Sequence, residues 1–136
     1  MSRSNGRPPR MALLVPAIAL AGLVVVSACG SGPGRTPPPE VPRGNPSQGV
    51  TAIEQFGCGS CHTIPGVRGA DGTVGPPLEN WSRRGFIAGE LPNNGANLIR
   101  WIMDPQGVEP GTAMPELGVS EEQARDIAAY LFTLGR

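Results

Sequence analysis

The stretch FGCGSCHTIPG, residues 56–66, decides how this chain can fold. It holds two of the three cysteines in the sequence and the single histidine. Cys58 and Cys61 are three residues apart, and His62 follows directly behind them. Two thiols and an imidazole at this spacing can hold a metal ion, form a redox-active dithiol, or attach a haem. The rest of the sequence has to supply what each of these sites requires.

Residues 1–28 have the pattern of an export signal. Three arginines precede an apolar run over residues 11–26, and the run ends in VSAC at residues 26–29. This ending resembles a bacterial lipobox, in which Cys29 is lipidated and becomes the new N-terminus. The alternative is an uncleaved anchor helix, since residues 11–28 are just long enough to span a bilayer. Both interpretations place the following chain on the outer face of the cytoplasmic membrane, periplasmic or extracellular, and tethered to it.

Residues 29–45 form a predicted linker. The sequence GSGPGRTPPPEVPRGN at residues 30–45 is rich in glycine and proline and has no apolar periodicity. Consecutive prolines favour an extended spacer of about 3.1 Å per residue, which reaches roughly 50 Å. The folded part is therefore expected over residues 46–136, as one small domain.

The first expected helix begins at Pro46. Asn45 is placed to cap it, and Gln48 lies where a capping box needs it. The apolar side chains of this helix fall on one face. They are Ala52, Ile53 and Phe56.

Two further helices carry their own start and stop signals. One begins near Asn94 and has to end around Asp104, because a proline follows. The other begins after Ser120, with Gln123 completing a capping box and Gly135 closing its C-terminal end. No segment alternates clearly enough to predict a strand. The sequence predicts an all-α domain of three to four helices with long loops.

The long loops indicate that something other than side chains fills the core. Residues 63–93 are rich in glycine and proline, so a domain of this size buries too little apolar surface alone. A disulfide between Cys58 and Cys61 would close a small ring and add little stability. Structural zinc needs four cysteine or histidine ligands, and only three are present outside the export signal. A thioredoxin-like dithiol needs a βαβ unit, which the sequence does not predict. We therefore predict one covalently bound haem c, with thioethers from both cysteines and His62 on the iron.

The second axial ligand is predicted to be a methionine, because the chain has one histidine and no lysine. Met103 lies inside a predicted helix, where an apolar side chain usually packs in the core. Met114 lies in a loop bounded by glycine and proline, which can hold a thioether against iron. Met114 is the preferred candidate. A thioether ligand raises the reduction potential, and two filled axial positions predict one-electron transfer and not an enzyme.

Four motifs resemble the class I c-type cytochromes over residues 46–136. They are CGSCH at 58–62, GPPL at 75–78, TAMP at 112–115 and IAAYL at 127–131. Residues 91–120 are most similar to the cytochrome c domain fused to subunit II of caa-type haem–copper oxidases. The resemblance implies that Cys58 and Cys61 bind the haem, that His62 and Met114 are the iron ligands, and that the carbonyl of Pro76 accepts a hydrogen bond from His62. It also implies core positions for Leu78, Ile127 and Tyr130.

The first helix departs from the family pattern in one respect. The family places a glycine eight residues, and an aromatic residue four residues, before the first cysteine. Those positions are Val50 and Glu54 in this chain. Gly49 and Ile53 can serve instead only if one extra residue, such as Gly57, is absorbed before the motif.

The remaining polar candidates have two interpretations. Trp81, Arg83, Arg84 and Trp101 could donate to the haem propionates, or they could be solvated arginines and half-buried tryptophans. From residue 46 onward the chain has six arginines, ten carboxylates and no lysine. A lysine-rich docking face therefore does not exist. Partner encounter is expected to depend more on the tether than on a positive patch.

The predicted function is a membrane-tethered monohaem cytochrome that carries electrons between a quinol–cytochrome c reductase and a terminal haem–copper oxidase. No nucleic acid or small-molecule substrate is expected. One alternative is a haem enzyme or sensor, peroxidase-like or gas-binding, whose methionine ligand is labile. Another is a haem-free thiol lipoprotein.

Overall fold

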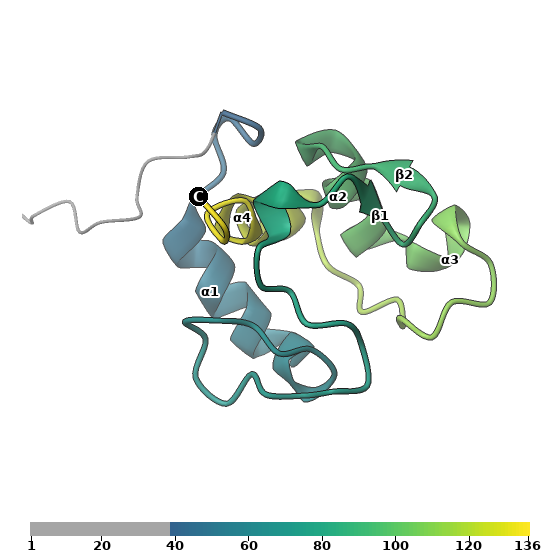
Figure 1. Cartoon of the computed structure of the whole chain (residues 1–136), viewed down its shortest axis with the longest axis horizontal. Helices are drawn as coiled ribbons and strands as arrows, with labels where there is room; N and C mark the ends of the chain where they lie inside the picture. The colour runs from purple at the N-terminus through teal and green to yellow at the C-terminus, as the bar shows by residue number, and fades with distance from the viewer. Residues whose placement is uncertain (1–38) are drawn as a thin grey trace, which may run out of the picture. The chain divides into compact units, whose positions relative to one another are not determined.

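The structure, a computed structural model, describes residues 39–136 (Figure 1). The predicted export signal, Cys29 and residues 29–38 of the predicted linker lie outside the described residues. The elements are α1 (Pro46–Gln55), β1 (Phe86–Ile87), β2 (Leu91–Pro92), α2 (Gly95–Met103), α3 (Pro105–Val108) and α4 (Glu121–Leu131), with 3₁₀ turns at Cys58–Ser60 and Trp81–Arg83. The small helical fold with long loops is confirmed. Within residues 39–136, no helix has the length and apolar character to cross a bilayer.

The C-terminal helix α4 packs against both α1 and α2 and organises the domain (Figure 1). At the α1 contact, a Cβ atom added to Gly49 would overlap the backbone carbonyl of Asp126. Gly57 follows α1 in the left-handed conformation, with φ 67°, before the cysteine motif. Gly49 therefore takes the close-contact position at the helix crossing, and the left-handed Gly57 fits the extra residue that the sequence predicts before the motif.

The N-terminal end of α1 differs from the prediction in one contact. The Asn45 side chain accepts hydrogen bonds from the backbone N–H groups of Ser47 and Gln48, as a helix cap should. The predicted capping box does not form, because the Asn45 N–H donates to the carboxylate of Asp126 at 2.7 Å. A contact with α4 replaces the local contact with Gln48.

The folded part begins earlier than predicted. Val41, placed in the predicted linker, is buried in the core with 2% of its surface exposed. The Glu40 carbonyl lies so close to Gly95 that a side chain there would overlap it, and the Glu40 carboxylate pairs with Arg136. A Cβ atom added to Gly44 would lie 2.6 Å from the Cβ of Ala129. These residues are part of the domain and not of a free spacer.

The other two main helices confirm their predicted N-terminal caps. The C-terminal end of α4 differs from the prediction, because the helix ends at Leu131 with Phe132 as its cap, and Gly135 lies beyond it with φ 98°. Asn94 caps α2, and Ser120 and Gln123 form the capping box of α4. The short helix α3 and the antiparallel hairpin β1–β2 were not predicted. The hairpin pairs Phe86 with Pro92 and Ile87 with Leu91. Strands of two residues leave no alternating pattern in a sequence, which is why the sequence did not indicate them.

Candidate functional site

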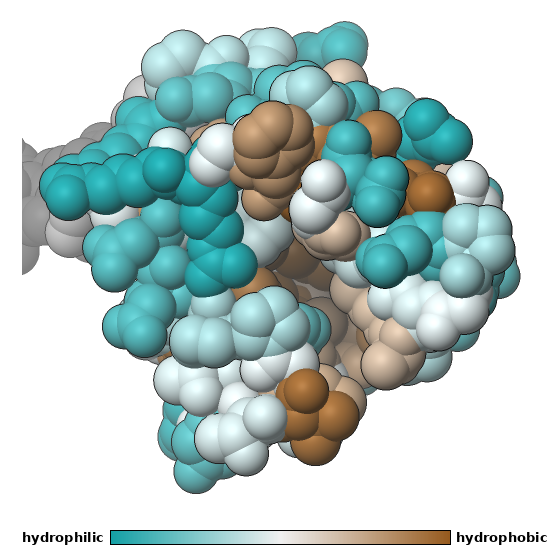
Figure 2. All heavy atoms as spheres, turned by 45° about the vertical axis from the view of Figure 1, so that its right-hand side comes forward, coloured by the Kyte–Doolittle hydropathy of each residue, from teal (hydrophilic) through white to brown (hydrophobic). Residues whose placement is uncertain are grey.

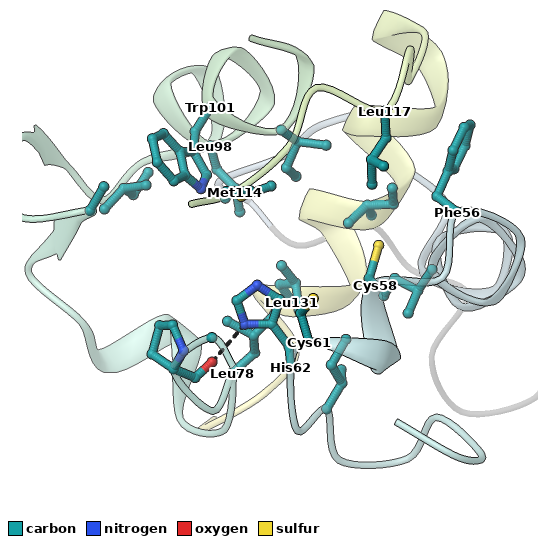
Figure 3. Close-up of a pocket in the computed structure, with 18 of the residues that line it drawn as sticks. Phe56, Cys58, Cys61, His62, Leu78, Leu98, Trp101, Met114, Leu117 and Leu131 are labelled. Carbon is teal, nitrogen blue, oxygen red and sulfur yellow. Dashed lines mark hydrogen bonds between the residues drawn. The ribbon is translucent and has the colours of Figure 1, made fainter. Parts of the chain in front are cut away.

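A cavity of about 390 Å³ lies between the loop after α1 and the loop after α3. Figure 2 shows it as a hollow bordered by apolar side chains, and Figure 3 shows the residues that line it. Buried aliphatic side chains form most of its floor. They include Ile64, Leu78, Leu98, Ile102, Ile127 and Leu131. Leu78 and Ile127 are buried, as expected for core positions, and their side chains also line this cavity.

The cysteine motif lies on one wall of the cavity. Gly57 turns the chain out of α1 into the 3₁₀ turn Cys58–Ser60, and the N–H of His62 donates to the Cys58 carbonyl at 3.0 Å. This tight turn brings Cys58, Cys61 and His62 to the same cavity. Both thiols are free. Burial raises the pKa of the Cys58 thiol, and the neighbouring Cys61 adds to the rise.

The imidazole of His62 is held in one tautomer. Its Nδ1 lies 2.7 Å from the carbonyl oxygen of Pro76, as the resemblance implied. A carbonyl only accepts, so Nδ1 carries the proton and Nε2 keeps its lone pair. Figure 3 shows Nε2 pointing into the cavity. Gly75 lies directly against the ring, where any side chain would overlap it. A hydrogen bond to the far ring nitrogen is the usual support of a metal-bound histidine.

Met114 and His62 approach the cavity from opposite sides. Figure 3 shows the thioether side chain on one wall and the imidazole on the other, with the apolar space between them. Met103, the last residue of α2, does not line this cavity and packs against the core. Of the two methionines considered, Met114 is the one that the fold brings to the site.

Three of the four candidate donors to the haem propionates line the cavity, and the fourth does not. Trp81, Arg84 and Trp101 line the cavity, whereas Arg83 donates its Nε–H to the carbonyl of Gly135 at 2.6 Å. The Arg84 guanidinium carbon lies 4.9 Å from the centroid of the Trp81 ring. Burial lowers the pKa of Arg84. It also donates to backbone carbonyls of the neighbouring loop. The buried indole Nε1 of Trp81 has no hydrogen-bond partner among the described residues. A buried donor without a partner suits a polar group of a bound molecule.

Three exposed apolar side chains lie at the mouth of the cavity, and sequence analysis did not identify them. Val74, Phe86 and Leu117 have 80%, 62% and 39% of their surface exposed. They come from three separate loops and strands, so no local pattern could have grouped them. Figure 2 shows apolar surface gathered around the hollow.

The residues present fit a covalently attached haem. Two free thiols and an imidazole with an available Nε2 occupy one wall, a thioether faces them, and the space between is apolar. The unpartnered Trp81 Nε1 offers a donor for a carboxylate at the edge. Within residues 39–136, no three His, Cys, Asp or Glu side chains gather as a metal site, so these side chains do not form the cluster that zinc requires. A haem bound here would supply one-electron redox chemistry.

The sequence comparisons agree with this arrangement. Residues 47–135 match the family described as cytochrome c. A protein named cytochrome c oxidase subunit 2 from Alkalihalophilus pseudofirmus is 39% identical over 89 residues, which is 65% of this chain and 25% of that protein. A protein of the same name from a Bacillus species is 34% identical over 87 residues, 61% of this chain and 24% of that protein. A "cytochrome c homolog" from Bradyrhizobium diazoefficiens is 33% identical over 91 residues, 57% of this chain and 48% of that protein. The chain thus spans about a quarter of both oxidase subunits and about half of the third relative.

Proposed function

This chain belongs to the cytochrome c family, electron carriers that bind haem c covalently, and from that premise we propose that it is a membrane-tethered monohaem cytochrome. In this proposal it carries single electrons in a respiratory chain and delivers them to a terminal haem–copper oxidase. The observation that carries the proposal is the pairing of His62 and Met114 across one apolar cavity. If both side chains held the iron, no open position would remain for a substrate.

The proposed ligand set divides the work among a few residues. Cys58 and Cys61 would fix the haem to the 3₁₀ turn, so that its position relative to His62 is set by the backbone. Pro76 holds the imidazole ring through its carbonyl, and this hydrogen bond makes the ring a better electron donor. A thioether from Met114 would favour ferrous iron and raise the reduction potential. The apolar walls would keep water from the bound haem and raise the potential further.

Delivery to an oxidase is supported by two relatives whose names describe them as oxidase subunits. The alignments cover 89 and 87 residues of this chain, and residues 47–135 match the cytochrome c family. A quinol–cytochrome c reductase is the proposed electron source. The proposed tether is a lipid on Cys29, which would place the domain on the outer face of the cytoplasmic membrane. Tethering raises the effective concentration of the domain near membrane-bound partners.

Mass spectrometry and absorption spectroscopy of the mature protein test the proposal together. We expect the mass of one covalently added haem, an acylated N-terminal Cys29, and a methionine-to-iron charge-transfer band in the ferric state. A Met114→Ala variant should lose this band, whereas Met103→Leu should keep it. Prompt carbon monoxide binding by the reduced wild type would instead favour the haem enzyme or sensor. A folded, colourless product would contradict the proposal entirely.

A further inference from the structure

One exposed side chain, that of Gln106 on α3, holds the loop that carries Met114. Its Nε2 donates to the carbonyl of Thr112 at 2.8 Å and to the carbonyl of Met114 at 3.2 Å. Its Oε1 accepts from the N–H of Gly111 at 3.0 Å. We call residues 109–115 the methionine loop. A single amide therefore contacts this loop at three points.

The arrangement uses both ends of the amide. Two carbonyl oxygens face the NH₂ group and one N–H faces the oxygen, so the opposite orientation of the Gln106 amide would break all three bonds. An exposed glutamine loses side-chain entropy when it is fixed in this way. Three simultaneous hydrogen bonds to the backbone can offset that loss.

The other hydrogen bonds of residues 110–114 stay within the methionine loop. The N–H of Thr112 donates to the carbonyl of Glu109 at 3.1 Å, and the N–H of Met114 lies 3.4 Å from the Thr112 hydroxyl. Such bonds shape the loop but do not fix it relative to the rest of the domain. Among the described residues, Gln106 supplies the hydrogen bonds that do so for Gly111, Thr112 and Met114.

Gln106 is itself held by the end of α2. Asp104 closes α2 by donating its N–H to the carbonyl of Arg100 at 3.0 Å, and its carboxylate accepts from the N–H of Gly107 at 2.7 Å as the cap of α3. Pro105, the first residue of α3, is buried. A continuous path of backbone and side-chain contacts therefore runs from α2 through Gln106 to the backbone of Met114.

We propose that Gln106 is a positioning residue that keeps the methionine loop in place and so holds the Met114 thioether toward the iron. This inference rests on the proposed role of Met114 as the second axial ligand. Gln106 touches neither the cavity nor the haem site directly. It acts through the carbonyls of Thr112 and Met114, whose side chains both line the cavity.

The test compares three variants of the full-length holoprotein. Gln106→Leu removes all three hydrogen bonds. Gln106→Glu keeps the side-chain length and the bond from Gly111 but sets a carboxylate oxygen against two carbonyl oxygens. Gln123→Leu is the matched control, because Gln123 also bonds to the backbone, in the α4 capping box, but does not line the cavity.

Three readouts separate positioning from stability. In ferric Gln106→Leu and Gln106→Glu we expect a weakened or shifted methionine charge-transfer band and imidazole binding about tenfold tighter than in the wild type. Amide hydrogen exchange at Gly111 should be slow in the wild type and faster in Gln106→Leu. Gln123→Leu should unfold at lower denaturant concentration while its band and its imidazole affinity stay as in the wild type.

The outcomes are distinct. A Gln106→Leu protein that keeps the wild-type band and imidazole affinity overturns the positioning role and leaves the proposed function intact. A wild type without the charge-transfer band overturns the ligand assignment and this inference with it. If neither Gln106 variant yields holoprotein, hydrogen exchange in the wild type decides: protection of the Gly111 N–H supports the proposal, and unprotected exchange overturns it.

Discussion

At the scale of single residues, Gly75 controls where the His62 imidazole can lie. Its N–H donates to the carbonyl of Cys61 at 2.7 Å, and a Cβ atom here would overlap the imidazole ring. We therefore expect Gly75→Ala to displace the ring from the Pro76 carbonyl. The ferric absorption spectrum and the reduction potential should change measurably. Gly85→Ala is the control, because a Cβ atom there meets no atom within 4 Å. A normal spectrum and potential for Gly75→Ala would show that the ring tolerates the contact.

Tyr130 links the last helix to the loop behind the cysteine motif. Its hydroxyl donates to the carbonyl of Pro65 at 2.5 Å, beside Gly66, which has φ 79°. Removing this hydrogen bond with Tyr130→Phe should lower the free energy of unfolding by about 1 kcal/mol at neutral pH. Chemical denaturation of the holoprotein measures the difference.

The same residue predicts a dependence of stability on alkaline pH. Burial raises the pKa of Tyr130 in the folded protein. As the pH rises above about 10, the unfolded chain loses the phenolic proton first, so the free energy of unfolding falls. The chain has no lysine and only one tyrosine, so few other groups titrate there. The wild type should lose more stability than Tyr130→Phe between about pH 8 and about pH 11. Equal losses of stability in the two proteins would show that Tyr130 does not cause the alkaline pH dependence.

At the scale of elements, the crossing of α1 and α4 depends on Gly49. A methyl group at this position would overlap the Asp126 carbonyl, which belongs to the backbone of α4 and cannot rotate away. We expect Gly49→Ala to push the helices apart and to lower the free energy of unfolding by roughly 2–3 kcal/mol. Glu54→Ala, at an exposed position of the same helix, should change it by less than about 0.5 kcal/mol. Denaturant unfolding of both variants tests the contrast.

The elements that the sequence predicted are those whose signals are local. Asn94 and Ser120 cap their helices with neighbouring backbone groups, so the signal and the contact lie within one turn. The capping box of α1 failed because Asp126, far away in sequence, takes the Asn45 N–H. The burial of Val41 was missed for the same reason, since Val41 lies against Gly95 of α2 and the nearby Gly44 lies against Ala129 of α4.

The candidate site was predictable to a similar extent. Cys58, Cys61 and His62 form a contiguous motif, and Met114 was chosen because its loop is bounded by glycine and proline. Residues whose role depends on contacts with distant parts of the sequence could not be identified from a local sequence pattern. Gln106 meets its partners only because α3 forms and the methionine loop folds back onto it.

At the scale of the whole described domain, residues 39–45 join the core to the chain that precedes it. Val41 is buried, and the Glu40 carboxylate pairs with Arg136 at the other end of the domain. We expect Val41→Asp to lower the free energy of unfolding by roughly 2–4 kcal/mol, because it buries an unpaired carboxylate. Pro42→Ala, at an exposed position beside it, is the control. Thermal unfolding of both holoproteins measures the difference in stability. Equal stability of the two variants would show that residues 39–45 are a free spacer.

Partner encounter is also a property of the whole domain. Val74, Phe86 and Leu117 border the cavity mouth, while within residues 39–136 the cavity is lined by just two charged residues, Arg84 and Glu109. The Arg84 guanidinium is already engaged with the Trp81 ring and with backbone carbonyls. An electron partner that docks over the mouth would therefore bury apolar surface and neutralise little charge.

The rate of electron transfer to a purified terminal oxidase should accordingly depend on apolar contact more than on salt. Residues 39–136 hold seven arginines and eleven carboxylates, but long-range effects of these charges are screened within about 8 Å at physiological ionic strength. We expect Phe86→Ser to slow the second-order rate about tenfold, since it removes an exposed aromatic side chain that a docked partner would cover. Oxidation of the same variant by ferricyanide should stay unchanged, which separates docking from damage to the haem site. A wild-type rate that falls steeply as salt is added would show that charge governs the encounter instead.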